Sequence, residues 1–203
     1  MDTAAEWLRE LHYPSDIDGQ ADLIRSWGFT IYRTAYGPSS EQQWQQLLQT
    51  MQKQAEEKIL SSTDATEDDP TFQHLWSLFR LDARSDPALA NLPFEQLRQL
   101  YIAGEGVAPM NTNLRSHRVF LAVDEEVLSG VEGCIVKCVE ADYLAEEHVP
   151  RCPRRYPQRY FGWFKMTVKS VVGLWKELET FPVETVAPQT IGGSHLVVWE
   201  DEL

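Results

Sequence analysis

The segment from Trp27 to Gly37, WGFTIYRTAYG, constrains the fold more than any other part of the chain. It is dense in β-branched and aromatic residues, which predicts a strand. Side chains alternate across a strand, which places Phe29, Ile31, Arg33 and Ala35 on one face and Thr30, Tyr32, Thr34 and Tyr36 on the other. The Gly-Pro-Ser-Ser sequence at 37–40 then ends the strand. Ser39 or Ser40, with Gln42 or Gln43 three residues later, predicts a capping box. The segment therefore predicts a strand, a tight turn and a helix.

Arg33 interrupts the otherwise apolar face of this strand. A buried guanidinium group needs carboxylate or carbonyl partners, because an unpaired buried charge is very costly. One interpretation is that Arg33 pairs with one of the many acidic residues or extends to water. The other is that Arg33 projects into a pocket and binds an anion.

The same segment resembles a known group of proteins. The similarity consists of WGFTIYRTAYG, a following helix that carries Trp44, and FRLDARSDP at 79–87. It identifies a large group of proteins from filamentous fungi, which carry a Gly-Phe-x-Ile-Tyr-Arg-Thr-x-Tyr-Gly strand near the N-terminus. The resemblance covers about residues 20–130 and implies a fungal, intracellular origin. The group has no established activity, so the resemblance assigns no catalytic residue.

Hydrophobic periodicity predicts the remaining elements. Helices are expected at 3–12, 21–26, 40–59, 93–103 and 170–179, and further strands at 74–82, 117–123, 134–139 and 194–199. Residues 160–168 are expected to form either a fifth strand or the start of a helix. The first two strands flank a helix, so they are expected to be parallel neighbours or to enclose another strand, as in ferredoxin-like sheets. The predicted fold class is α+β, with helices on a mixed or antiparallel sheet of about five to six strands. An elaborated ferredoxin-like arrangement is one alternative.

The chain of 203 residues is expected to form a single domain, 1–203. Residues 1–26 predict a helical cover for the core, and 61–71 (SSTDATEDDPT) predict an acidic exposed loop. Residues 149–164 predict an irregular basic loop, because three prolines there prevent a regular helix or a central strand.

Composition excludes several classes of protein. A net charge of −13 disfavours nucleic-acid binding, which depends on neutralising phosphates. The N-terminal sequence lacks the features of a secretion signal, and no apolar run is long enough to span a membrane. We therefore expect a cytoplasmic protein with no membrane contact. The three cysteines, Cys134, Cys138 and Cys152, fit reduced thiols better than disulfides or a metal site.

The standard catalytic and nucleotide-binding motifs are missing from the sequence. Two weaker candidates are the acidic run Asp124-Glu125-Glu126, as a base or metal ligand, and Cys152 with His148, as a reactive thiol. In each case a solvated turn or an incidental loop cysteine is the simpler interpretation. His117 and Arg118 open one strand and point to opposite faces.

The basic loop is the strongest candidate for a binding site. Residues 149–170 contain six Lys or Arg and no acid, whereas the other 12 basic residues share the rest of the chain with all 31 acidic ones. Arginines beside aromatic residues suit an anionic or planar ligand. The alternative is that the loop pairs with the acidic surface of its own chain or of a second copy in a homodimer.

Two functions follow from these observations. The first is a small-molecule-binding or metabolite-processing protein without a metal or nucleotide cofactor, in which Arg33, Arg154 or Arg155, and Trp163 converge on one apolar cavity. Its ligand would be a small anionic or aromatic molecule. The predicted ligand-binding residues are Arg33, Tyr32, Arg118, Arg154, Arg155, Tyr160 and Trp163. The second is a non-catalytic protein–protein interaction module that uses residues 151–164 on an exposed patch.

Overall fold

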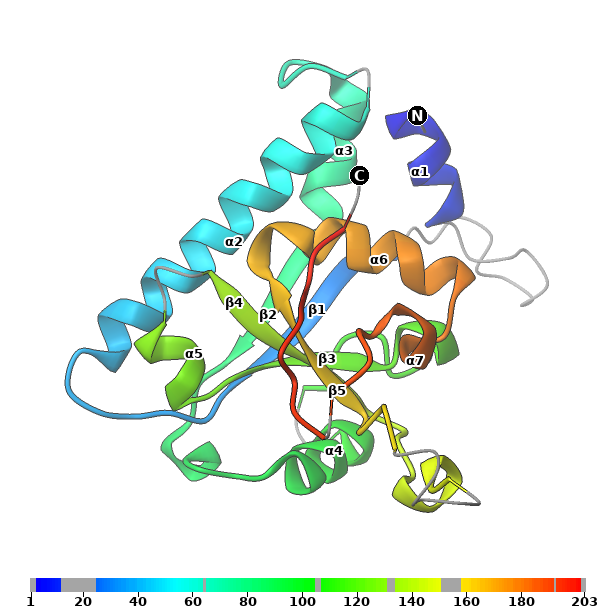
Figure 1. Ribbon diagram of the computed structural model, residues 1–203. Helices are drawn as coiled ribbons and strands as arrows, with labels where there is room; N and C mark the ends of the chain where they lie inside the picture. The colour runs from blue at the N-terminus through cyan, green and yellow to red at the C-terminus, as the bar shows by residue number, and fades with distance from the viewer. Residues whose placement is uncertain are drawn as a thin grey trace.

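A mixed β-sheet forms the centre of the protein (Figure 1). The computed structural model describes residues 3–11, 25–63, 65–104, 107–130, 134–150, 158–191 and 193–201. Within these ranges the sheet has six strands in the order β2-β1-β3-β4-β5-β6. The strands are β1 (Trp27–Arg33), β2 (Phe79–Arg84), β3 (Val119–Val123), β4 (Ile135–Glu140), β5 (Trp163–Thr167) and β6 (Val198–Trp199). The α+β class is therefore confirmed.

Helices lie between these strands along the chain. They are α1 (Ala4–Glu10), α2 (Ser40–Ser62), α3 (Pro70–Leu78), α4 (Phe94–Ala103), α5 (Glu125–Ser129), α6 (Val171–Thr180) and α7 (Val183–Val186). Short 3-10 turns occur at η1 (Pro87–Leu89), η2 (Arg115–His117), η4 (Ala145–His148) and η5 (Val168–Ser170). The predicted helices at 3–12, 40–59, 93–103 and 170–179 are confirmed within a few residues. Part of the predicted helix at 21–26 lies outside the described residues.

The strand pairings decide between the two topologies that the sequence left open. Strand β1 is parallel to both of its neighbours, β2 and β3. Strands β3, β4 and β5 pair antiparallel in succession, and β6 is parallel to β5. The chain thus returns from β1 through α2 and α3 directly to the adjacent β2. This is the parallel alternative, not the enclosed strand of a ferredoxin-like sheet.

The two faces of the sheet carry separate cores (Figure 1). The larger core lies under α1, α2, α3 and α6 and contains Trp7, Trp44 and Trp175 together with Phe29 of β1. The smaller core lies under α4, where Leu97 and Tyr101 pack on Tyr32, Phe120 and Val139. The alternation predicted for β1 is confirmed, since Phe29 and Tyr32 enter different cores.

The predicted strand at 74–82 is wrong in its first half. The chain is helical from Pro70 to Leu78, and β2 begins at Phe79. Asp69 caps the helix by accepting the Thr71 N–H, and Pro70 occupies a first-turn position where no N–H is needed. Phe72 and Leu75, three residues apart, are the buried positions. A capped start and helical spacing therefore outweigh the apolar run that resembled a strand.

The third and fourth strands form an antiparallel pair whose connection contains a short helix. Val119 to Ala122 pair antiparallel with Lys137 to Glu140. Between them Asp124 caps α5 by accepting the Val127 N–H. Residues 65–69 of the predicted acidic loop connect α2 to α3 and are mostly exposed, whereas residues 61 and 62 still belong to α2.

Candidate functional site

Arg33 joins the end of β1 to the start of α2. Its side chain is 3% exposed, and its Nε donates to the Ala35 carbonyl oxygen at 3.0 Å. One terminal nitrogen contacts Glu41 and lies 3.3 Å from the Ser85 Oγ, while the other donates to the Ser40 Oγ at 2.8 Å. Pairing with an acidic residue, the first interpretation of Arg33, is thus what the structure shows. With its donors engaged by the protein, Arg33 does not project into a pocket.

The capping box predicted for α2 does not form, and Ser40, one of its two candidate serines, contacts Arg33 instead. Ser39 adopts a left-handed conformation and makes no side-chain cap. The Ser40 Oγ instead accepts the Gly37 N–H at 2.8 Å and donates to the Gly37 carbonyl at 2.7 Å. Ser40 therefore closes the turn and positions the guanidinium group at the same time.

The predicted convergence of Arg33 and Trp163 is wrong. Arg33 shares its face of the sheet with Phe29 and Ile31, which belong to the core under α2. Trp163 packs against Phe94 on the α4 face. The buried Tyr32 belongs to the same smaller core. Alternation along strands separates these side chains by the thickness of the sheet. Burial raises the pKa of the Tyr32 phenol and favours its neutral form.

Two other predicted residues lie behind an acidic cleft. Arg118 pairs with Asp142 at 3.1 Å, and the Tyr160 hydroxyl donates to Glu140 at 2.7 Å. The cleft has a cavity volume of about 740 Å³ and is lined by Glu140, Asp142 and Glu179, among other residues. Burial raises the pKa of Glu140 and that of Glu179. Arg154 and Arg155, and Cys152 with them, lie outside the described residues, so the calls on them stay predictions.

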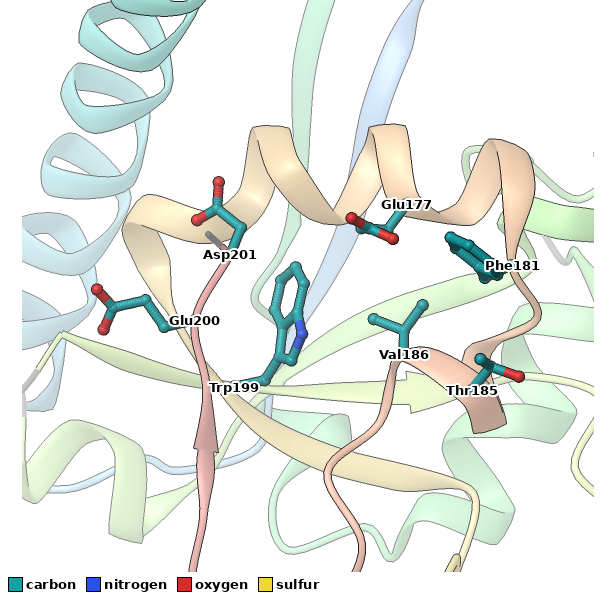
Figure 2. Close-up of a pocket in the computed structure, with 7 residues that line it drawn as sticks. All are labelled: Glu177, Phe181, Thr185, Val186, Trp199, Glu200 and Asp201. Atoms are coloured by element: carbon teal, nitrogen blue, oxygen red, sulfur yellow. The ribbon is translucent and has the colours of Figure 1, made fainter. Parts of the chain in front are cut away.

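A second hollow lies beside the C-terminal segment (Figure 2). Figure 2 shows Trp199 between this segment and α6, with Phe181 and Val186 on the opposite side. The cavity volume is about 650 Å³. Its carboxylates include Asp201, which pairs with Lys58 at 2.9 Å, and Glu200, which pairs with Lys169. These ion pairs hold the segment against α2 and η5, which gives them a structural role.

A third and smaller cleft lies beside Trp163, at the edge of the α4 face. We call it the Lys137 cleft, and its lining residues are Glu126, Val127, Gly130, Ile135, Lys137, Lys165, His195, Leu196 and Val198. Lys137 lies in the middle of β4 between two residues of the larger core, so alternation directs it to the opposite face. Its cross-strand neighbour on β5 is Lys165. The pairing register therefore brings two lysines together.

Two carboxylates at the end of β3 neutralise these lysines. The Lys137 Nζ lies 2.5 Å from Asp124 and 2.7 Å from Glu126, and Lys165 contacts the other oxygen of Glu126. Hydrogen bonds from Lys137 and Lys165 lower the pKa of Glu126 to about 2. Burial by itself would lower the pKa of Lys137, but its bonds to Asp124 and Glu126 raise it above the ordinary value. Glu126 and Lys137 are therefore both charged at neutral pH.

His195 lines the cleft, and its imidazole stacks on the indole of Trp163. The rings of His195 and Trp163 lie 3.6 Å apart at an interplanar angle of 26°, and the Lys137 ammonium lies 5.3 Å from the Trp163 ring centre. Burial lowers the pKa of His195, and the positive charges of Lys165 and Lys137 lower it further. His195 is therefore neutral at pH 7 and offers one donor and one acceptor.

The rest of the Lys137 cleft is apolar. Aliphatic side chains of Val127, Ile135, Leu196 and Val198 line a cavity of about 300 Å³. Leu196 is 70% exposed at this position, although burial is usual for so large an apolar side chain. A small cavity with apolar walls and a few convergent polar groups is the arrangement typical of ligand sites.

Sequence reasoning missed both lysines and His195, although it singled out Trp163, the ring on which His195 stacks. One sequence feature indicated the site, because Lys137 is a charge inside the apolar strand CIVKCV, as Arg33 is inside its own strand. Glu126 was considered as a base or metal ligand, but the structure pairs it with lysines. In the described part of the chain, no group of three or more His, Cys, Asp or Glu is placed to hold a metal ion.

The cysteine and membrane predictions can be compared with the described ranges. Cys138 is free, and burial in the larger core raises the pKa of its thiol. No helix in these ranges is long and apolar enough to cross a membrane.

Comparison of the chain with protein-family models, curated proteins and solved structures gave no match. The fungal resemblance therefore stays a prediction.

Proposed function

We propose that the protein binds a small molecule with an anionic or aromatic group in the Lys137 cleft. The observation that carries this proposal is the convergence of two lysines, a carboxylate and a stacked imidazole on one apolar cavity of about 300 Å³. These groups come from β4, β5, α5 and the segment before β6. Nothing in the core requires four charged side chains at this position, since buried charges are costly to maintain.

The charge states favour binding over covalent chemistry. A lysine acts as a nucleophile when its pKa is lowered, so that the free amine is present. The pKa of Lys137 is raised instead, and the ammonium form has no lone pair. The two lysines therefore serve as cationic hydrogen-bond donors, and the aliphatic walls accommodate the body of the ligand.

Thermal-shift and calorimetric titrations with aromatic monocarboxylates test the proposal. A ligand that binds only the native state raises its stability, by about 2.7 kcal/mol at a hundredfold excess over its Kd. Lys165→Met should abolish the response, because it removes a cation that lines the cleft. Lys53→Met is the matched control, because Lys53 pairs with Glu57 on the exposed face of α2.

Equal responses in the wild type and in both variants would place binding elsewhere and refute the proposal. The same conclusion follows if none of the compounds shifts the wild-type protein. The alternative function, an interaction module that uses residues 151–164, stays a prediction because residues 151–157 lie outside the described ranges.

A further inference from the structure

Glu126 has a different position in the ion cluster from its three partners. Asp124 is held twice, since it accepts the Val127 N–H at 3.2 Å and contacts Lys137. The polar contacts described for the side chain of Glu126 are with the two lysines alone. Glu126 lies within the five-residue helix α5 at the mouth of the Lys137 cleft. It is therefore the member whose side chain can leave without breaking a helix cap or a strand pairing.

Solvent exposure shows the same asymmetry. The side chain of Glu126 is 56% exposed, whereas those of Lys137 and Lys165 are 8% and 21% exposed. Rotation of Glu126 into water would hydrate its carboxylate in exchange for its two lysine contacts. The lysines cannot follow, because their aliphatic stems are packed in the sheet. Departure of Glu126 would leave two ammonium groups and one carboxylate beside an apolar cavity.

The vacated position would suit one particular kind of anion. One oxygen of Glu126 lies 2.7 Å from Lys137, and its other oxygen contacts Lys165. The carboxylate thus bridges two cations with one oxygen each and adds one negative charge. A ligand carboxylate can reproduce both contacts, and its single charge restores neutrality. Its apolar body would then lie along Val127, Ile135 and Leu196.

We propose that Glu126 occupies the anion subsite of the Lys137 cleft, and that the carboxylate of a small apolar monocarboxylic acid displaces it on binding. This inference rests on the proposed function and specifies its ligand class. Glu126 is then an internal competitor, which lowers affinity for weak anions and is itself replaced by ligands that also fill the apolar cavity.

Calorimetry with acetate, isobutyrate and benzoate, each beside its primary amide, tests the inference. The amides keep the shape of the acids but lack the charge. Glu126→Gln should bind isobutyrate and benzoate about threefold to tenfold more tightly than the wild type, because the competing charge is gone. Its affinity for the amides should not change. Glu57→Gln, which breaks an exposed ion pair on α2, is the matched control and should bind as the wild type does.

A second variant, Glu126→Ala, removes the side chain in case the glutamine amide still reaches the lysines. Unfolding midpoints show that each variant is folded. Acid binding that is unchanged or weaker in both Glu126 variants would overturn the inference and leave the proposed function standing. Binding of amides but not acids would do the same. If no acid or amide binds to any variant, both proposals fail.

Discussion

Acidification should destabilise the protein through His117, whose imidazole is buried as a neutral ring. The residue is 2% exposed, and its ring lies 4.1 Å from that of Trp175. Its Nε2 lies 3.0 Å from the Trp175 carbonyl oxygen, and its Nδ1 lies 2.9 Å from the Ser116 Oγ. A carbonyl oxygen only accepts, so Nε2 carries the proton and Nδ1 accepts the Ser116 hydroxyl. A second proton, on Nδ1, would reverse the direction of the latter bond and bury a charge.

The size of the effect follows from the pKa. Burial, the largest cause, lowers the pKa of His117 from 6.5 to about 4, and the charge of Arg25 adds to this, against the hydrogen bond to Trp175. The folded chain therefore binds fewer protons than the unfolded chain below pH 6.5. The stability that His117 contributes is fully present above pH 6.5 and is lost as the pH falls toward 4. Linkage gives a loss of about 2 kcal/mol between pH 8 and pH 5.

Urea unfolding at pH 8 and pH 5 measures this loss. The wild type should lose about 2 kcal/mol more between the two pH values than His117→Gln, because the glutamine amide does not titrate. His74→Gln is the control, because His74 is exposed on α3 and its replacement should leave the pH dependence of the wild type unchanged. Equal losses in the wild type and in His117→Gln would refute the reasoning.

Three further substitutions test the structure by urea unfolding. Gly28→Ala should cost about 4 kcal/mol or more, because φ of Gly28 is +119° and an added Cβ would lie 2.0 Å from the Arg80 carbonyl oxygen. Gly37→Ala is the control and should change stability by less than about 0.5 kcal/mol, because an added Cβ there would meet no atom within 4 Å. Similar effects of the two substitutions would contradict the β1–β2 geometry. Arg33→Met should cost about 2 kcal/mol, because it removes the hydrogen bonds from Arg33 to the Ala35 carbonyl oxygen and to Ser40 at the start of α2. Wild-type stability in this variant would show that these contacts contribute nothing. Burial raises the pKa of Glu140 and penalises its charged form. Glu140→Gln should therefore be more stable than the wild type at pH 8 and lose that advantage as the pH falls toward 4.5. An advantage that is equal at pH 8 and pH 5 would contradict this.

Local patterns predicted the elements whose periodicity is unambiguous. The stripe of α2 from Trp44 to Ile59 and the end of α4 at Gly104 follow from helical spacing and from a left-handed glycine. The assignment failed at the apolar run 74–78, which fits a strand as well as a helix. The cap at Asp69, several residues upstream, decides between them, and the packing of α3 on the core supports the helix.

The candidate site was harder to predict, because its members are distant in the sequence. Lys137 is conspicuous in its strand, but nothing local indicates that Lys165 is its cross-strand neighbour or that His195 stacks on Trp163. Predictions about Arg33 and Trp163 failed for the same reason. Arg33 lies in a correctly predicted strand and Trp163 in a segment expected as a strand or a helix start, yet they belong to opposite faces of the sheet.

The sequence by itself determined the strand, turn and helix at residues 27–59, the α+β class and the need of Arg33 for carboxylate or carbonyl partners. These depend on alternation, helical spacing and the cost of an unpaired buried charge, all of which act over a few residues. Only the tertiary structure decided the strand order, the face on which each side chain lies and the convergence of Glu126, Lys137, Lys165 and His195. The physical reason is that strand register is set by hydrogen bonding and packing between distant segments, and a shift of one residue would move every side chain to the other face.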